Sequence, residues 1–155
     1  MKQKNVLEKE IFSLLTSKQV AEISDNALIK DYFAGQIVYG QKEQAKNLFI
    51  LLDGEVTLRL PSRSDLSLDA FSLEIEKIND HGSIFGTNLL FGVKRYITRA
   101  VATASSKILV LDSLKFLEII QKNNSEFIIM SYLSKVYFHR YIHAMKEFEE
   151  CARVK

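Results

Sequence analysis

The sequence predicts a mainly β fold of the α+β class: an antiparallel β-roll or jelly-roll barrel flanked by N-terminal helices and a long C-terminal helix. Three observations lead to this prediction. Many short apolar runs lie between glycine turns from Gly35 to Asp112, as strands do. Few helical patterns separate these runs, which favours antiparallel pairing over alternating strands and helices. A long apolar stripe at helical spacing then follows, from about Ser125 to Glu150.

Composition narrows the class of protein. The chain has 155 residues with mixed charges and a formal net charge of +2, so residues 1–155 fit one domain without general affinity for nucleic acid. The apolar run Val6-Leu7 is too short for a signal peptide, and no run approaches the roughly 20 residues of a membrane helix. Cys151 is the only cysteine, which rules out an internal disulfide and favours a reducing compartment. We therefore expect a cytoplasmic protein without membrane contact.

Residues 1–32 are predicted to form the N-terminal helices, because apolar side chains recur there at spacings of three and four. A first helix is followed by two further short ones that begin near Ser17. The apolar positions of this pattern are Val6, Leu7, Ile11, Leu14, Leu15, Val20, Ile23 and Leu28.

Residues 33–112 are predicted to form the roll. Its first strand is Gln36-Ile37-Val38-Tyr39, which stands between two glycines. The apolar run 48–52 is followed by Asp53-Gly54, a strong signal for a β-hairpin. The alternation from Val56 to Leu60 then gives the partner strand one solvated face. A polar turn at 61–65 and further strands at 71–78, 96–103 and 107–111 complete the pattern.

Residues 113–150 are predicted to form the C-terminal helices. Asp112 or Ser113 can cap a helix that ends at Lys122. The polar segment 123–125 separates it from the last helix, which is roughly 39 Å long at 1.5 Å per residue. The apolar stripe of that helix fits either pairing with a second copy or packing against its own roll. The stripe comprises Phe127, Met130, Leu133, Tyr137, Tyr141, Ala144 and Phe148.

The segment from Gly82 to Arg95 is the most informative part of the chain. Two glycine turns bracket a short apolar helical pattern, and a basic residue precedes the next strand. A turn that ends at a helix N-terminus presents several backbone N–H groups to a small anion, and a guanidinium can bind the same anion bidentately. The segment therefore predicts a phosphate pocket, although the glycines also fit tight turns alone.

Several motifs, in order, resemble one known family. They are Phe33-Ala34-Gly35-Gln36-Ile37 with Gly40, the run from Leu48 to Val56, Gly82-Ser83-Ile84-Phe85-Gly86, Leu89-Leu90, and Ile108-Leu109-Val110-Leu111-Asp112 leading to Phe116. In this pattern the chain resembles the cyclic nucleotide-binding domains of catabolite activator proteins, kinase regulatory subunits and gated channels. The resemblance covers nearly the whole chain and implies an eight-stranded roll whose phosphate-binding cassette spans residues 82–99.

The resemblance also implies a ligand site with altered chemistry. Thr87 stands where similar domains have a glutamate for the ribose 2′-hydroxyl. Tyr96 stands where they have the phosphate-binding arginine, so that Arg95, one residue earlier, and Arg99, on the strand face of Ile97, are the two candidates. Both also fit the interpretation of ordinary surface arginines. The implied ligand-binding residues are Phe85, Gly86, Thr87, Asn88, Arg95, Tyr96, Ile97 and Arg99.

Two functional interpretations follow. The first is a regulatory sensor, without a resident cofactor, that binds a ligand such as cAMP or cGMP and signals through its last helix as a homodimer. That helix would hinge near residues 123–125. The second is a roll that has lost its ligand and serves in dimerisation or in docking an unknown protein. The altered Thr87 and displaced arginine favour the second interpretation, and the intact Phe85-Gly86 turn favours the first, which we adopt.

Other functional classes have weaker support. His139, His143, Glu147 and Cys151 stand four residues apart, but one straight helix cannot wrap four ligands around one ion, so we expect no metal site. No nucleophile elbow, phosphate-binding loop or paired-carboxylate motif is present, so we expect no enzyme. In catabolite activator-like proteins a helix-turn-helix follows the last helix. None precedes Lys155 here, and we expect no direct binding to DNA.

Overall fold

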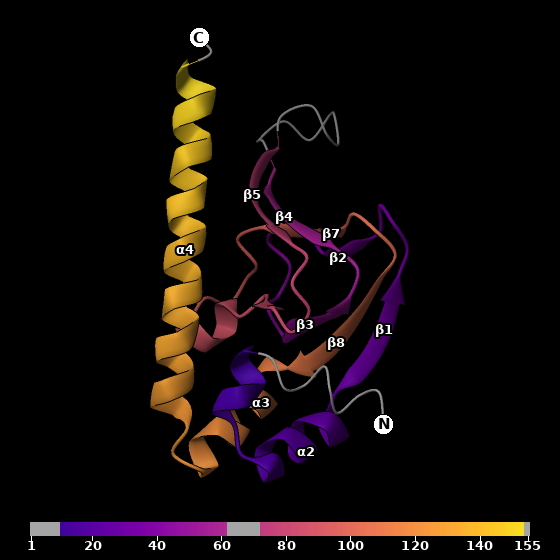
Figure 1. The fold of residues 1–155 in the computed structure, drawn as a ribbon, viewed down its shortest axis with the longest axis vertical. Helices are drawn as coiled ribbons and strands as arrows, with labels where there is room; N and C mark the ends of the chain where they lie inside the picture. The colour runs from indigo at the N-terminus through magenta and orange to yellow at the C-terminus, as the bar shows by residue number, and fades with distance from the viewer. Residues whose placement is uncertain (1–9, 62–71, 154–155) are drawn as a thin grey trace.

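In the part of the chain that the structure describes, two four-stranded antiparallel sheets form the roll (Figure 1). The protein is represented by a computed structural model that describes residues 10–61 and 72–153. The first sheet has the strand order β1-β8-β3-β6 and the second the order β2-β7-β4-β5. The strands are β1 (Leu28–Tyr32), β2 (Ile37–Tyr39), β3 (Asn47–Asp53), β4 (Val56–Leu60), β5 (Leu73–Ile78), β6 (Ile84–Phe85), β7 (Arg99–Ala102) and β8 (Ser106–Asp112).

Helical segments flank the roll, as the sequence predicts. They are the 3-10 helices η1 (Glu10–Leu14) and η2 (Asn88–Phe91) and the α-helices α2 (Ser17–Asn26), α3 (Ser113–Lys122) and α4 (Glu126–Arg153). Figure 1 shows α2 and α3 at one end of the roll and α4 running along its side. The predicted mainly β fold with flanking helices is therefore confirmed. None of the helices in the two described ranges is long and apolar enough to span a membrane.

The wholly apolar run in β3 is explained by its position between two hydrophobic clusters. Leu48 and Ile50 pack with residues of η1, α2, α3 and α4 on one side of the first sheet. Phe49 and Leu51 pack with residues of both sheets in the interior of the roll. Because successive side chains of a strand point to opposite faces, a strand that is buried on both faces needs apolar side chains at successive positions.

The predicted hairpin at Asp53-Gly54 is wrong. β3 pairs with β6 and β8, whereas β4 pairs with β5 and β7, so this turn carries the chain from one sheet to the other. Gly54 has φ +93°, and a Cβ there would lie 2.4 Å from the carbonyl oxygen of Ser105. Glycine is therefore needed here because two turns approach each other closely. In the sequence, an Asp-Gly pair looks the same whether it forms a hairpin or a turn between two sheets.

The predicted N-terminal helices extend too far along the chain. α2 begins with a capping box between Thr16 and Gln19 and ends at Asn26, after which Ala27 is extended. Residues 28–32, assigned to helix from the spacing of Leu28, form β1 and pair with β8. Antiparallel pairing at the sheet edge decides their conformation, and spacing alone does not reveal it. Residues 1–9, with the apolar pair Val6-Leu7, lie outside the described ranges.

The two C-terminal helices and the break between them are confirmed. The Lys115 backbone N–H donates to the Asp112 side chain at 2.9 Å, which is the predicted helix cap. The break contains Asn124 at φ +55°, a left-handed conformation. Of the predicted loop and strand between residues 61 and 78, positions 62–71, including Phe71, lie outside the described ranges.

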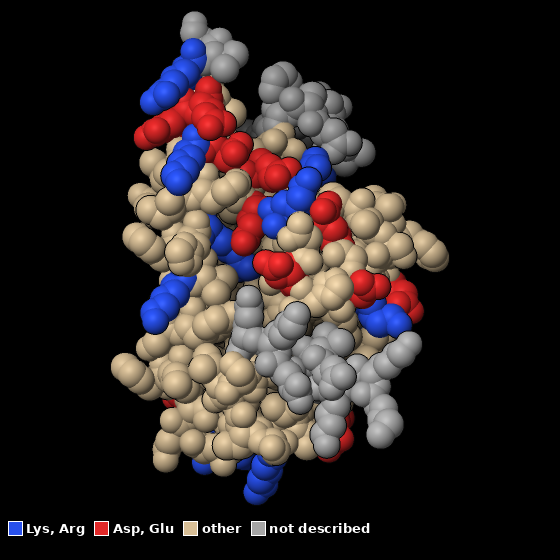
Figure 2. All heavy atoms as spheres, viewed as in Figure 1, with Lys and Arg blue, Asp and Glu red and all other residues tan. Residues whose placement is uncertain are grey.

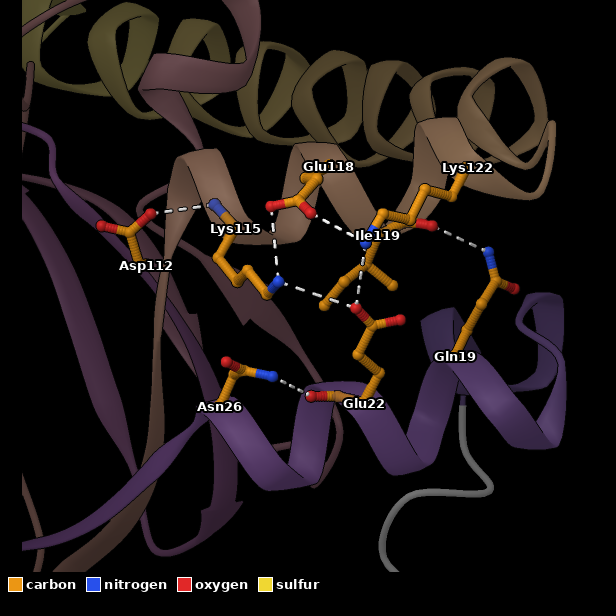
Figure 3. Close-up of polar contacts among 8 residues, drawn as sticks. All are labelled: Gln19, Glu22, Asn26, Asp112, Lys115, Glu118, Ile119 and Lys122. Carbon is orange, nitrogen blue, oxygen red and sulfur yellow. Dashed lines mark hydrogen bonds and ion pairs between the residues drawn. The ribbon is translucent and has the colours of Figure 1, made fainter.

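A network of polar contacts holds α2 against α3 (Figure 3), and a further contact joins α2 to Ser125, just before α4. Gln19, which is fully buried, donates to the Ile119 carbonyl at 3.3 Å and to the Ser125 hydroxyl at 3.0 Å. Glu22 and Glu118 share the ammonium groups of Lys115 and Lys122 at the surface. The break between α3 and α4 is therefore anchored to the N-terminal part of the fold, while the rest of α4 contacts β5 of the second sheet.

Candidate functional site: a cavity between the roll and α4

A cavity of about 240 Å³ lies between the second sheet, the segment after β6 and one face of α4. Its walls are mostly apolar and aromatic, as is usual for small-molecule sites. The lining residues are Tyr39, Leu58, Leu60, Ile75, Gly86, Asn88, Ile97, Thr98, Tyr137, Arg140, Tyr141 and Ala144. The predicted cassette and the last helix thus both contribute to one cavity.

The turn after β6 is tightly packed against the interior of the roll. Gly86 has φ +68°, and a Cβ there would lie 2.7 Å from the Phe49 ring. The helical turn that follows is only η2, Asn88–Phe91, with Thr87 before it. Its first residues present backbone N–H groups that the turn itself does not use. The Phe-Gly pair therefore serves the packing of the roll, and Gly86 and Asn88 reach the cavity wall.

A hydrogen bond joins the cassette to α4. The hydroxyl of Thr87, which is fully buried, donates to the hydroxyl oxygen of Tyr137 at 2.8 Å. The Tyr137 ring meets the edge of the Phe91 ring at a centroid distance of 5.1 Å. Burial raises the pKa of the Tyr137 hydroxyl above its ordinary value. The side chain predicted to hold a ligand hydroxyl is thus paired with a phenol from the same chain.

Arg140, one helical turn after Tyr137, is the charged residue of the cavity. Its side chain is almost completely buried, and it is the only charged residue in the cavity lining that the described residues provide. The Nε group donates to the carboxylate of Glu76 on β5, and Nη2 donates to the carbonyl oxygen of Ile84 at 2.8 Å. The guanidinium also lies 5.8 Å from the centroid of the Tyr137 ring. Arg140 therefore ties α4 to both sheets beside the cassette.

Sequence reasoning missed Arg140, although a signal was present. The apolar stripe of α4 places Leu133, Tyr137 and Ala144 on one face, and Arg140 falls on that face in the same spacing. A long cation within an apolar stripe indicates a buried partner or ligand, because unpaired charges are rarely buried.

Of the predicted ligand-binding residues, the structure brings Gly86, Asn88 and Ile97 to the cavity wall. Thr87 lies at the α4 contact described above. Phe85 is fully buried and stacks on Phe49 in the interior of the roll. The roles of these five residues toward a ligand stay predictions.

The other three predicted residues lie away from the cavity lining. Arg95 is exposed, and its Nη1 donates to the Lys42 carbonyl at 2.7 Å. Arg99 lies on β7, where the alternate residues Ala100 and Ala102 face the interior of the roll, so that Arg99 points the other way. The Tyr96 hydroxyl donates to the Asn47 carbonyl at 2.6 Å. Burial raises the pKa of Tyr96 to about 12.

The histidines of α4 do not gather into a metal site. His143 Nε2 lies 4.0 Å from a carboxylate oxygen of Glu147, one helical turn away. Within residues 10–61 and 72–153, no group of three or more histidine, cysteine, aspartate or glutamate side chains is arranged to hold an ion.

Several solved structures share this fold at low sequence identity. A protein of Geobacter metallireducens GS-15 assigned to the cyclic nucleotide-binding proteins is 20% identical, with a TM-score of 0.72 over 91% of this chain and 98% of that one. The sensor domain of the transcriptional regulator DNR from Pseudomonas aeruginosa is 19% identical, with a TM-score of 0.70 over 90% and 92% of the two chains. The catabolite activator protein of Thermus thermophilus is 17% identical, with a TM-score of 0.65 over 95% of this chain but 63% of that one.

These likenesses establish the fold, and a family model establishes the family. No curated protein matches the chain. The family model described as the cyclic nucleotide-binding domain matches residues 29–123, which include both sheets, the cassette and α3. The resemblance found in the sequence is confirmed, and the chain belongs to the cyclic nucleotide-binding domain family.

Proposed function

We propose that the protein is a regulatory sensor that binds a cyclic nucleotide of the cAMP or cGMP class and signals through α4. Family membership supports the ligand class. The observation that carries the proposal is the hydrogen bond between Thr87 of the cassette and Tyr137 of α4. The group proposed to recognise the ligand and a group on α4 share one contact, so a ligand that accepts the hydrogen bond of the Thr87 hydroxyl releases Tyr137.

The size of the cavity supports a coupled movement. Its volume of about 240 Å³ is below the roughly 300–1,000 Å³ of ordinary small-molecule sites. A nucleotide would therefore enter only when Tyr137 leaves Thr87 and α4 moves outward. The polar break at residues 123–125, with Asn124 in a left-handed conformation, is the proposed hinge. Its anchor to Gln19 would keep α3 in place while α4 moves.

The cassette backbone is the proposed phosphate cradle. N–H groups of Gly86, Thr87 and Asn88 would bind the phosphate without requiring particular side chains. Arg95 would have to leave the Lys42 carbonyl to take part, and Arg99 would have to act from a strand position that faces away from the roll interior. Loss of the charge-assisted contact to the ribose at Thr87 would weaken binding by about tenfold.

The test is isothermal titration of the purified chain with cAMP, cGMP and cyclic dinucleotides, together with melting curves. The sensor proposal predicts heat of binding and a rise in melting temperature for at least one of them, because a ligand that binds only the folded state stabilises it. Absence of both effects for every nucleotide would end the sensor proposal.

A second candidate function, dimerisation or docking of a protein partner without a ligand, is favoured by the outer face of α4. On the face seen in Figure 2, most side chains along the lower half of α4 are uncharged, and acidic and basic side chains gather near its C-terminal end. Large apolar side chains are exposed along this helix: Phe127, Ile128, Phe138, Tyr141, Ile142, Met145 and Phe148. An exposed apolar surface of this kind favours association with another protein.

We propose that the protein forms a homodimer through these exposed apolar side chains of α4. We also propose that it acts in the cytoplasm. Phe138, with 61% of its surface exposed, is the residue to change. Sedimentation should give a dimer for the wild type and a monomer for Phe138→Glu. A wild-type monomer at high micromolar concentration would contradict the homodimer. The absence of direct DNA binding stays a prediction.

A further inference from the structure

We propose that Arg140 is the residue that binds the phosphate of the ligand, and that Glu76 is an internal carboxylate whose place the phosphate takes. This inference rests on the proposed function, since it concerns the same cavity. It assigns the cation of the site to the output helix instead of the cassette, where Arg95 and Arg99 lie away from the cavity lining.

Burial of a guanidinium calls for an explanation. Only 7% of Arg140 is exposed, and removing a charge from water is costly unless it is paired and fully hydrogen-bonded. Structural pairing alone could be provided at the surface, yet this cation borders a cavity whose other described lining residues are uncharged. A cation beside an otherwise uncharged cavity is the arrangement expected for recognition of an anionic group.

The contacts of Arg140 place it beside the cassette turn. Nη2 donates to the carbonyl of Ile84, which lies two residues before Gly86. The guanidinium and the cassette backbone therefore approach the cavity from neighbouring positions. One phosphate held by both would have backbone donors on one side and a planar, bidentate donor on the other.

Glu76 makes an exchange of anions feasible. In the present conformation its carboxylate pairs with the Nε group of Arg140. Its side chain is 33% exposed, against 8% for that of Arg140. A phosphate that displaces Glu76 would keep the buried cation paired, and the released carboxylate could be hydrated. The exchange thus avoids the large cost of an unpaired buried charge.

The same contact would report binding to the output helix. Arg140 and Tyr137 lie one turn apart on α4, so a ligand would break the Tyr137 contact to Thr87 and form a new one with Arg140. The ligand would then hold α4 in a different position from that set by Glu76 and Thr87. The bistable element is α4, and its two anionic partners are Glu76 and the phosphate.

The experiment compares cAMP with adenosine, which lacks the phosphate, by titration of the full chain. Wild type should prefer cAMP. Arg140→Gln should bind cAMP about 10- to 100-fold more weakly, the range for loss of a charged hydrogen bond, and should bind adenosine nearly as well as wild type does. Arg140→Lys should restore part of the preference, because it keeps the charge but loses the planar fork.

Two further variants separate recognition from folding. Glu76→Gln should tighten cAMP binding several-fold by removing the competing carboxylate, whereas a purely structural pair predicts no gain. The double variant Glu76→Gln with Arg140→Gln leaves no unpaired buried charge and should still lose the preference for phosphate. Lys146→Gln, which removes an exposed positive charge from the same helix, is the matched control.

The outcomes are distinct. If wild type binds no nucleotide, the proposed function and this inference both fail. If wild type binds cAMP and the double variant binds it within about twofold, only this inference fails, and the sensor proposal stands. Loss of the cAMP preference in Arg95→Gln or Arg99→Gln, with the preference of Arg140→Gln unchanged, would show that a cassette arginine binds the phosphate and would overturn this inference.

Discussion

The contact between Thr87 and Tyr137 yields the sharpest prediction. Tyr137→Phe removes one oxygen atom and keeps the ring that packs on Phe91. The Thr87 hydroxyl, fully buried, then loses the acceptor to which it donates at 2.8 Å. Because the ring is retained, the change isolates one hydrogen bond between the cassette and α4.

The expected magnitude follows from that burial. A hydrogen bond between neutral groups contributes about 0.5–1.5 kcal/mol net, and a buried group left without a partner costs about 1–3 kcal/mol. We expect Tyr137→Phe to lower the free energy of unfolding by about 1–2 kcal/mol. Thr87→Val, of similar shape, should cost a comparable amount, and the double variant little more than either single one, a coupling of about 1 kcal/mol.

Urea denaturation of the four proteins measures the coupling, and titration with cAMP measures its consequence. Weakening the closed arrangement by about 1 kcal/mol should tighten cAMP binding by Tyr137→Phe up to about fivefold, because less free energy is spent in releasing α4. Additive losses of stability, with coupling below about 0.3 kcal/mol, would refute the stabilising role of the bond. Unchanged or weaker cAMP binding by Tyr137→Phe would refute the proposal that the bond between Thr87 and Tyr137 holds α4 in the closed position.

Three further predictions concern the fold that positions the site. Gly54→Ala should lower the free energy of unfolding by at least about 1 kcal/mol in urea, because it adds a Cβ at positive φ against a neighbouring turn; a neutral effect would contradict the close approach. Gln19→Leu should lower the free energy of unfolding, measured by thermal melting, by about 1–3 kcal/mol, because it removes the buried hydrogen bond to Ser125. Gln19→Glu should also lower the melting temperature, and a melting temperature equal to that of wild type would argue against this contact. Burial raises the pKa of Tyr96 to about 12 from 10, so the folded state holds this proton more tightly than the unfolded chain does, and stability should be complete below pH 10 and fall as the pH rises through 12. The fall in melting temperature should be smaller in Tyr96→Phe, and an equal fall would refute the assignment.

Much of the fold was predictable because apolar periodicity and glycine turns are local signals. The cap at Asp112 and the break before α4 are written in adjacent residues, and both are confirmed. The turn at Gly54 shows where local signals fail. A glycine is required there because Ser105, far along the chain, lies close to it. A dipeptide carries no information about which sheet the next strand joins. The helix predicted for residues 28–32 is wrong for the same reason, since pairing with β8 determines their conformation.

The candidate site was predictable only in part. The cassette turn at Gly86 and the participation of the last helix followed from motifs and from the resemblance. The partner of Thr87 did not, because Tyr137 lies fifty residues later and its role depends on how α4 rotates about its axis. Arg140 was not predictable from the apolar stripe, because a stripe defined by its hydrophobic members leaves out a charged residue in the same register. A charged residue in register with such a stripe is the signal to look for.

The proposed function requires α4 to move when ligand binds, and pulsed electron paramagnetic resonance measures this movement. Cys151 is the only cysteine and is exposed near the end of α4; a second label at Lys107→Cys, an exposed position on β8, gives the distance from helix to roll. Dilution with unlabelled protein removes distances between two copies. Saturating cAMP should shift the main distance, and Tyr137→Phe alone should populate part of that shifted distance. A single distance that stays unchanged in the presence of bound cAMP would contradict the proposed movement of α4.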